Sequence, residues 1–279
     1  MGTEFLQTLW KNRVARAGFI VVSGLIVVAV FAPGIARMDP NDCRLAAELS
    51  AISPQYWMGA DPDGCDIYSR VVYGARISLK VGITVVGFSA SLGIIIGLLS
   101  GYFGGWMDRA LMFVLECFQA FPGILLAITI TALSPTRSIN LVIFALCVSG
   151  WVGYARLVRG QTLLLREQEY VTAARALGQG PGRIMFREIL PNLMSPVIVQ
   201  ATFGMAGAIL AEAGLSFLGL GAPPGDPSWG SMLNEGREYM LVAPHISVFP
   251  GIAIMIVVLG FNFLGDGLRD ALDPKRRGR

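Results

Sequence analysis

The sequence predicts an all-α integral membrane protein with six transmembrane helices. Hydrophobic residues make up 54% of its 279 residues and charged residues only 15%, whereas ordinary soluble domains carry about 25% charged residues. The apolar residues also lie in long uncharged runs rather than in the amphipathic stripes of soluble helices. A water-soluble globular protein and a disordered chain are therefore excluded, and the 34 glycines show no strict period that would indicate a fibrous repeat.

Six segments meet, or nearly meet, the requirement of about 20 mostly apolar residues for a membrane-spanning helix. They are 17–36, 81–107, 117–136, 138–155, 189–211 and 241–265. The first segment follows basic residues, as the core of a signal peptide does, but its length and the lack of an A-x-A site favour an uncleaved span. Pro122, Pro196 and Pro250 are expected to kink or begin their helices, which neighbouring helices in a bundle tolerate.

The distribution of basic residues predicts the orientation of these spans. If residues 1–16 lie inside, the inner segments hold 15 of the 22 Lys and Arg residues and the outer segments hold 7. Because cytoplasmic loops carry the excess of Lys and Arg, we expect both terminal segments, 1–16 and 266–279, to be cytoplasmic. The outer loops are then 37–80 and 211–245.

Three basic residues conflict with this pattern, because Arg70, Arg76 and Lys80 fall in the outer loop 37–80. A helix lying along the outer membrane surface would accommodate them, with its apolar residues inward and the basic side chains reaching water. We therefore expect an interfacial amphipathic helix before the second span.

The inner loop 156–191 is the most informative segment, with six arginines and three glutamates between Arg156 and Glu188. It predicts two short helices, one over 166–177 that ends at Gly178 and one that begins at Pro181. Ala173 and Ala174 would form a small-residue notch that another chain can approach closely. A basic inner loop also satisfies the positive-inside rule without binding anything, so the composition alone leaves both interpretations open.

This loop resembles the EAA loop of ABC-importer permease subunits, whose pattern is E-A-A, three residues, Gly, nine residues and I-x-L-P. Five residues fall at that spacing: Ala173, Ala174, Gly178, Leu190 and Pro191. Thr172 stands in the position of the Glu, and Glu169 is similar to the acidic residue found in the peptide-importer branch.

Four further segments resemble motifs of the second permease subunit of dipeptide, oligopeptide and nickel importers. They are MGADPDGCDIYSRVVYGARISL, ECFQAFPGILLAI, LSFLGLGAPPGDPSWG and FNFLGDGLRDALDP, within 56–275. The resemblance implies a type I ABC-importer permease fold in the bacterial cytoplasmic (inner) membrane. This chain would form half of the pathway, and a paralogous permease subunit would form the other half.

The resemblance also implies the remaining partners. One or two ABC ATPase subunits would contact the loop around Glu169 and Gly178, an extracytoplasmic binding protein would deliver substrate, and lipid would surround the spans; nucleic acid is not an expected partner. The sequence lacks the phosphate-binding pattern G-x-x-x-x-G-K-[ST]. We therefore expect ATP and Mg on the ATPase subunits, with no catalytic residue, metal or cofactor on this chain.

Several residues are candidates for gating or for the pathway. The ECFQAFPGILLAI motif contains Glu116, Phe121 and Pro122, and Glu212 lies near the outer end of the fifth span. Carboxylates in spans are costly and often functional, but Glu116 and Glu212 are equally open to interpretation as structural anchors. Glu116 is expected to pair with Arg109 or with a partner subunit.

Two features remain at the membrane surfaces. Cys43 and Cys65 share the outer loop, where a disulfide between them is feasible, and His245 is expected to be an interfacial residue rather than a metal ligand. At the other surface, Asp266, Arg269, Asp270 and Asp273 have helical spacing, which predicts a salt-bridged helix end.

The motifs do not identify the substrate, because importers of peptides and of nickel or other metal chelates share them. Peptide is the expectation. A secondary transporter is a more remote alternative, because no internal repeat of spans is apparent. An intramembrane enzyme is less compatible still, because the sequence lacks the HExxH and G-x-S-x-G motifs.

Overall fold

The computed structural model describes residues 12–223 and 225–272, and this part of the chain consists of helices and loops with no β-strand, apart from an isolated bridge between Ala60 and Asp66. The helices that can cross a membrane are α2 (Arg13–Val30), α4 (Ile67–Phe103), the pair α5 (Gly105–Gln119) and α6 (Gly123–Ala132), α7 (Ile139–Leu165), α10 (Leu190–Phe217) and α12 (His245–Leu272). The predicted all-helical fold is confirmed, and the crossings number six when the bent pair counts as one.

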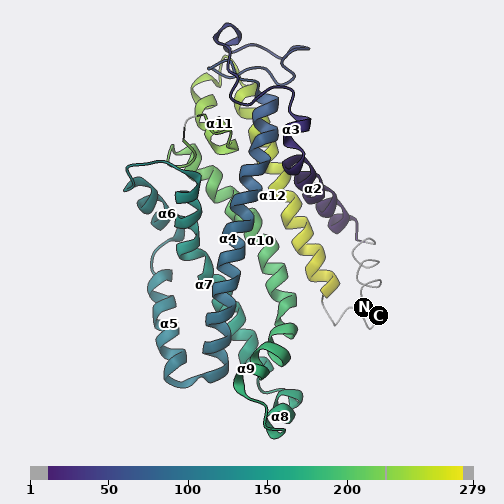
Figure 1. The fold of residues 1–279 in the computed structure, drawn as a ribbon, viewed down its shortest axis with the longest axis vertical. Helices are drawn as coiled ribbons and strands as arrows, with labels where there is room; N and C mark the ends of the chain where they lie inside the picture. Colours follow the sequence, from purple (N-terminus) through teal and green to yellow (C-terminus); the bar gives the residue numbers. More distant parts are fainter. Residues whose placement is uncertain (1–11, 224, 273–279) are drawn as a thin grey trace.

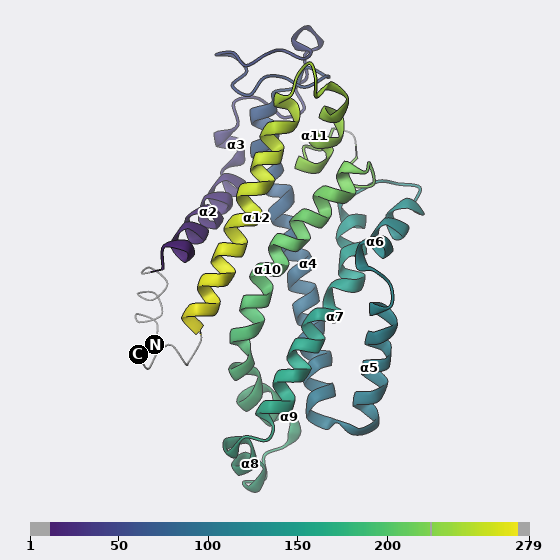
Figure 2. The same ribbon diagram turned by 180° about the vertical axis from the view of Figure 1, so that it is seen from behind.

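Shorter elements join these helices. They are α3 (Ala32–Ile35), η1 (Leu45–Ala47), α8 (Glu169–Ala176), α9 (Pro181–Arg183), the π-helical turn η2 (Ile184–Ile189), α11 (Trp229–Gly236) and η3 (Arg237–Tyr239). Successive crossings run in opposite directions, so α2 begins and α12 ends on the side of the bundle that carries α8 (Figures 1 and 2). The loop between α3 and α4 covers the opposite end, together with α11. We call these the α8 end and the loop end.

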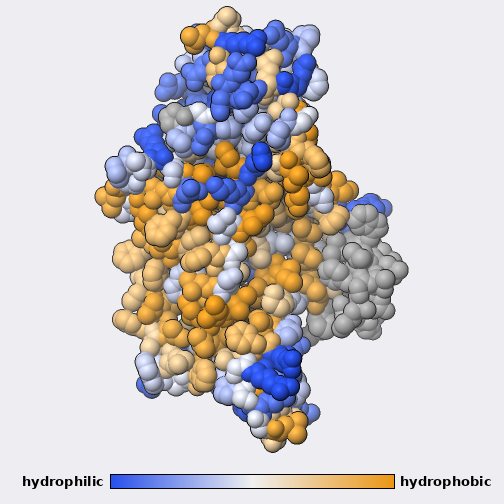
Figure 3. Space-filling model, in the orientation of Figure 1, coloured by the Kyte–Doolittle hydropathy of each residue, from blue (hydrophilic) through white to orange (hydrophobic). Residues whose placement is uncertain are grey.

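The surface divides in the same way. In Figure 3 hydrophobic residues cover the middle of the visible face, and hydrophilic residues gather at the loop end and over α8. A protein that spans a bilayer needs such an apolar belt, because the hydrocarbon core is about 30 Å thick.

The second crossing differs from the predicted arrangement. Residues 67–80 do not form an interfacial helix, because they are the first turns of the continuous helix α4, capped by Asp66, whose carboxylate accepts a hydrogen bond from the Ser69 N–H (3.0 Å). Arg70 does not reach water either, since its side chain is only 2% exposed. The outer loop, predicted over 37–80, therefore ends at Asp66, where α4 begins. This first part of α4 packs in the bundle against α11 and α12.

The third crossing also begins earlier than the predicted 117–136. Gly104 and Gly105 both have positive φ, +64° and +60°, and form the turn after α4, so the charged segment around Asp108 belongs to a helix rather than to a turn. The crossing is bent by 69° between α5 and α6, at the break that contains Pro122. Proline disrupts helices in this way, because it lacks the N–H that the preceding turn would bind.

The other crossings lie close to their predicted ranges. The main difference is that α7 continues to Leu165, so the first ten residues of the predicted loop 156–191 are helical. Close packing of α4 against α7 depends on Gly93, Gly97 and Gly101: a Cβ atom at Gly97 would lie only 2.7 Å from the Ala155 carbonyl oxygen. Small residues four apart allow membrane helices to approach in this way.

Candidate coupling and translocation site

Helix α8 projects from its end of the bundle and is held there by one buried face. Val171 and Ala174 are buried in a cluster with Leu98, Ile184 and Leu193, which come from α4, η2 and α10. The opposite face is exposed and includes Glu169 and Ala173. The predicted notch is therefore only half available to another chain, because the Ala174 side chain packs against its own bundle.

The end of α8 depends on a glycine conformation. Gly178 has φ of +75°, and the N–H groups of Gly178 and Gln179 bind the carbonyl oxygens of Arg175 (2.9 Å) and Ala174 (3.1 Å). This pair of bonds is the Schellman arrangement, which favours glycine at the left-handed position. It leaves the Leu177 side chain 81% exposed, as a hydrophobic side chain at the tip of the molecule.

Polar contacts connect α8 and its flanking loop to two crossings, α4 and α10. The Arg166 guanidinium donates to the Gly101 carbonyl near the end of α4 (2.9 Å), and the Arg175 guanidinium lies 5.4 Å from the centre of the Tyr102 ring. The Asn192 amide donates to the Tyr170 hydroxyl, which links α10 to α8 (3.4 Å). The loop also follows α7 directly in the chain, since Arg166 is the C-cap of that helix, so it is connected to α4, α7 and α10. Of the other predicted loop residues, Leu190 packs against the buried cluster and Pro191 is exposed at the start of α10.

An ion pair next to this loop was not predicted from the sequence. The Asp108 carboxylate of α5 accepts two hydrogen bonds from the Arg159 guanidinium of α7, at 2.6 and 2.7 Å, and a third from the Ser100 hydroxyl of α4. Bidentate pairs of this kind are strong and fix geometry. Three crossings are thus joined at the α8 end.

The candidate gating residues of the third crossing lie at its bend. Glu116, Phe121 and Pro122 are all exposed on the surface of the chain. The expected pairing of Glu116 with Arg109 is not formed, because the Arg109 side chain instead donates to the Gly105 carbonyl (3.4 Å). All three are therefore accessible to groups outside this chain.

Glu212 differs from them because it is fully buried. One carboxylate oxygen accepts a hydrogen bond from Ser216 (2.7 Å), and the other has no partner within the described residues. Gly230 of α11 packs on this turn of α10, since a Cβ there would lie 2.7 Å from Ser216. Glu212 thus lies beneath the contact between α10 and α11.

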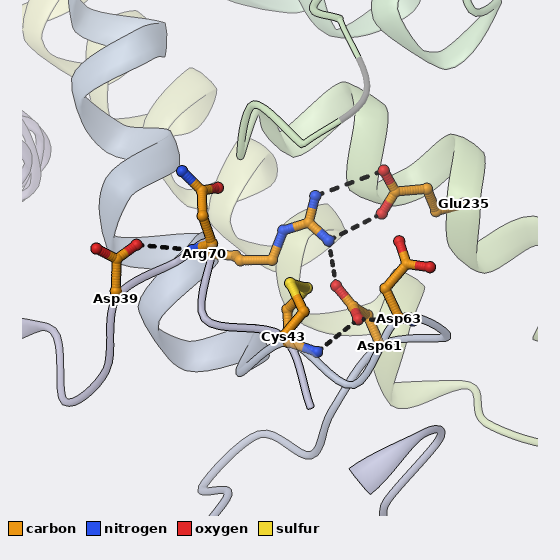
Figure 4. Close-up of a disulfide and its surroundings, with 8 residues drawn as sticks. Asp39, Cys43, Asp61, Asp63, Arg70 and Glu235 are labelled. Atoms are coloured by element: carbon orange, nitrogen blue, oxygen red, sulfur yellow. Dashed lines mark hydrogen bonds and ion pairs between the residues drawn. A yellow bond between two sulfur atoms is a disulfide. The ribbon is translucent and has the colours of Figure 1, made fainter. Parts of the chain in front are cut away.

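The loop end is held by a disulfide and a charged cluster (Figure 4). The structure contains a disulfide between Cys43 and Cys65. The Cys65 N–H donates to the Asp61 carboxylate (2.8 Å), which pairs in turn with Arg70. Arg70 also pairs with Glu235 of α11 (3.1 Å), so this cluster connects the loop, α4 and α11.

The cluster holds two carboxylates for one guanidinium. Burial is the main cause that raises the pKa of Glu235 above its ordinary value, the negative charge of Asp61 raises it further, and the positive charge of Arg70 opposes both. The cluster therefore favours a protonated Glu235 more than an exposed position would.

Two surface predictions have different outcomes. His245 begins α12 beneath the loop, with its ring against Gly59, and the described residues include no group of three or more metal-binding side chains. At the end of α12, Asp270 accepts a hydrogen bond from the Asn12 amide (3.3 Å), but Arg269 forms no ion pair within the described residues. Asp273 lies outside them.

Comparison with known families identifies this arrangement. The family model described as "Binding-protein-dependent transport system inner membrane component" matches residues 93–278, which is most of the chain and contains α8 and its contacts. The chain belongs to this family of ABC-importer permeases. A second model, the "N-terminal TM domain of oligopeptide transport permease C", matches residues 1–54. The predicted resemblance is confirmed, and the chain is a multi-pass membrane protein.

Two relatives are similar over nearly the whole permease. The "Dipeptide transport system permease protein DppC" of Alkalihalophilus pseudofirmus is 44% identical over 275 residues, which cover 98% of this chain and 90% of that protein. The "Glutathione transport system permease protein GsiD" of Escherichia coli is 45% identical over 276 residues, which cover 99% and 91%.

A solved structure shows the same fold. It is an inward-facing conformation of the MetNI methionine ABC transporter, with a TM-score of 0.60 and 19% identity, and the match covers 74% of this chain and 98% of that chain. The permease fold predicted from the motifs is therefore present, with α2, α4, α7, α10 and α12 as its long helices.

Proposed function

We propose that this permease is the membrane subunit of an ATP-driven importer of peptides in the bacterial inner membrane. Its similar relatives are named as dipeptide and glutathione permeases, and glutathione is itself a tripeptide. These names favour peptide over the nickel or metal-chelate alternative. An external binding protein would deliver the peptide at the loop end, and both termini and α8 would lie in the cytoplasm, where the excess of basic residues belongs.

The observation that carries this proposal is the construction of the α8 loop. Its exposed face and the Leu177 tip are free to contact another protein, whereas Val171, Arg166 and Tyr170 fix it to the crossings. An ATPase subunit bound to α8 would move α7 and α10 when it closes on ATP. Such a ligand-driven change requires a contact that differs between two states, and α8 supplies that contact.

The remaining partners follow from the same assembly. ATP and Mg²⁺ would bind to one or two ATPase subunits, so this chain is a transport subunit rather than an enzyme and carries no cofactor of its own. A paralogous permease would supply the other half of the pathway, forming a heterodimer. Exposed apolar side chains on α5 and at the bend before α6, such as Phe113 and Phe121, would face this subunit or lipid.

Reconstituted uptake tests the proposal. The permease would be assembled with its paralogue, ATPase subunits and binding protein in vesicles, and ATP-dependent uptake of a labelled dipeptide would be measured. Gly178→Val is expected to abolish most uptake, because a β-branched residue at φ of +75° strains the end of α8 by about 1–2 kcal/mol or more. Gly178→Asn should retain more uptake, because asparagine tolerates the left-handed conformation better.

Gly182→Ala is the matched control, since Gly182 lies four residues further on, has open space around it and does not have a positive φ. Its uptake should equal that of the wild type, and all variants should insert in the membrane equally well. Wild-type uptake by Gly178→Val would contradict the coupling role. Failure of the wild-type assembly to import any dipeptide would contradict the proposed substrate class.

A further inference from the structure

A cavity of about 310 Å³ lies in the middle of the bundle, between α4, α6, α7 and α10. Its wall includes four polar side chains at mid-bundle depth: Ser89, Ser149, Tyr154 and Gln200. The Ser89 hydroxyl is buried and has no hydrogen-bond partner within the described residues. Because an unpaired buried hydroxyl is costly, this wall is suited to a polar occupant.

A second cavity, of about 480 Å³, lies nearer the α8 end, between α7, α10 and α12. Its polar side chains are Ser195, Gln200 and Arg269. Gln200 therefore lines both cavities, and together they follow one side of α10 from the middle of the bundle toward its α8 end. Of the three helices around this second cavity, α10 lies between α7 and α12 in both views of the fold (Figures 1 and 2).

A third crevice of comparable size provides a contrast. It measures about 510 Å³, lies beside α4 and α7, and is lined mainly by large apolar side chains that include Phe88, Phe144 and Trp151. Such a lining suits lipid chains. The two cavities on the Gln200 side of α10 therefore offer several polar side chains, whereas the crevice near Phe88 is mainly apolar.

Arg269 gives the second cavity, the one nearer the α8 end, its positive charge. It lies in the last turn of α12, lines the cavity and forms no ion pair within the described residues. A guanidinium binds carboxylate with two parallel hydrogen bonds, and every peptide with a free C-terminus carries a carboxylate. The Ser195 hydroxyl and the Gln200 amide offer further hydrogen bonds on the opposite wall.

We propose that the two cavities that share Gln200 are this chain's lining of the translocation pathway, and that Arg269 binds the carboxylate of the passing peptide at the α8 end. This inference rests on the proposed function and adds to it the residues that contact the substrate. A phospholipid phosphate is the other anion that could reach Arg269, and the experiments below distinguish the two sources.

Cysteine labelling tests the lining. Ser149→Cys and Ser195→Cys are nearly isosteric substitutions in the two cavities. Each would be made in a background with Cys117→Ser and Cys147→Ala, which removes the free cysteines of the described residues. Thr84→Cys in the apolar crevice is the matched control. Reaction with a small charged thiosulfonate would be followed in the reconstituted complex with binding protein and ATP, with and without dipeptide. We expect dipeptide to slow labelling at 149 and 195 several-fold and to leave position 84 unchanged. Equal rates with and without dipeptide at 149 and 195 would overturn the proposal.

Uptake by Arg269→Gln and Arg269→Lys tests the anion. The KM for dipeptide should rise about tenfold in Arg269→Gln, the usual effect of losing a charge-assisted hydrogen bond, and Arg269→Lys should recover part of it. The same loss is expected in vesicles of phosphatidylcholine alone and in vesicles that also contain phosphatidylglycerol.

A loss confined to the vesicles with phosphatidylglycerol would assign Arg269 to lipid and overturn the carboxylate site, as would an unchanged KM. These outcomes leave wild-type uptake intact, so they differ from failure of the proposed function, in which the wild-type complex imports no dipeptide.

Discussion

Replacement of Arg70 by leucine tests whether the charged cluster holds the loop end together. The Arg70 and Asp61 side chains are each only 2% exposed, and Glu235 completes the cluster from α11. Removing the guanidinium leaves two carboxylates without their cation, one of them fully buried. Breaking a buried ion pair by removing one partner costs about 3–5 kcal/mol. Each kcal/mol lowers the Tm of a large domain by about 2–4 °C, so Arg70→Leu should lower the Tm by about 6 °C or more.

The assay is thermal unfolding of the purified permease in detergent. After heating, the folded fraction is measured as the monodisperse peak in size-exclusion chromatography. Arg76→Leu is the matched control, because Arg76 lies in the same helix but is exposed, and surface substitutions usually change stability by less than about 0.5 kcal/mol. Combining Arg70→Leu with Glu235→Leu and Asp61→Asn should recover part of the loss, because it removes the unpaired charges and keeps an oxygen for the Cys65 N–H. Equal Tm values for Arg70→Leu and Arg76→Leu would refute the reasoning.

Two further predictions concern the same end of the molecule. Cys65→Ser should destabilise the permease by about 3 kcal/mol, because the disulfide closes a loop of 22 residues. A reductant should lower the wild-type Tm similarly and leave the Tm of Cys65→Ser unchanged. A wild-type Tm that does not respond to reductant would contradict this prediction. The pKa of Glu235 is raised above 4.5 in the folded protein, so the unfolded chain loses this proton first as the pH rises. The stability that protonated Glu235 contributes is therefore present below about pH 4.5. It is lost as the pH rises through the pKa that Glu235 has in the folded protein. Relative to Glu235→Gln, the wild type should therefore lose Tm as the pH rises above about 4.5, and a relative gain in Tm would show that the charge of Arg70 dominates instead.

The long uncharged runs predicted the crossings well, because the cost of placing charge in lipid leaves few alternatives. The segments 189–211 and 241–265 lie almost entirely within α10 and α12. Gly178 and Pro181 also mark the end of α8 and the start of α9, since their backbone preferences act locally and need no knowledge of the rest of the fold.

The structure differs most from the predicted ranges where charged residues pair with distant partners. The sequence predicts that Arg70 lies in an interfacial helix of the outer loop and that Asp108 lies between two spans. In the structure each lies near the start of a crossing and pairs with a residue far along the chain: Glu235 for Arg70, and Arg159 for Asp108. A single sequence contains no signal for such pairs. The same limit applies to Ala174, whose burial depends on contacts with α4, η2 and α10.

The cavities could not be predicted for a related reason. Ser149, Ser195 and Gln200 are ordinary uncharged residues within long spans, and only the packing of α7, α10 and α12 shows that they share one side of the bundle. Arg269 was expected to belong to a salt-bridged helix end, and its position in a cavity became visible only in three dimensions.

Cross-linking from the tip of α8 to an ATPase subunit tests the central claim most directly. Leu177 and Leu133 are both 81% exposed and lie at the ends of α8 and α6, which are far apart in both views of the fold (Figures 1 and 2). Each would be replaced by cysteine in the assembled transporter and treated with a short bifunctional thiol reagent. Leu177→Cys is expected to cross-link to an ATPase subunit with a yield that changes when ATP is added, whereas Leu133→Cys should give no such product. Absence of the Leu177 product, or an equal product from Leu133, would contradict the assignment of α8 as the ATPase contact.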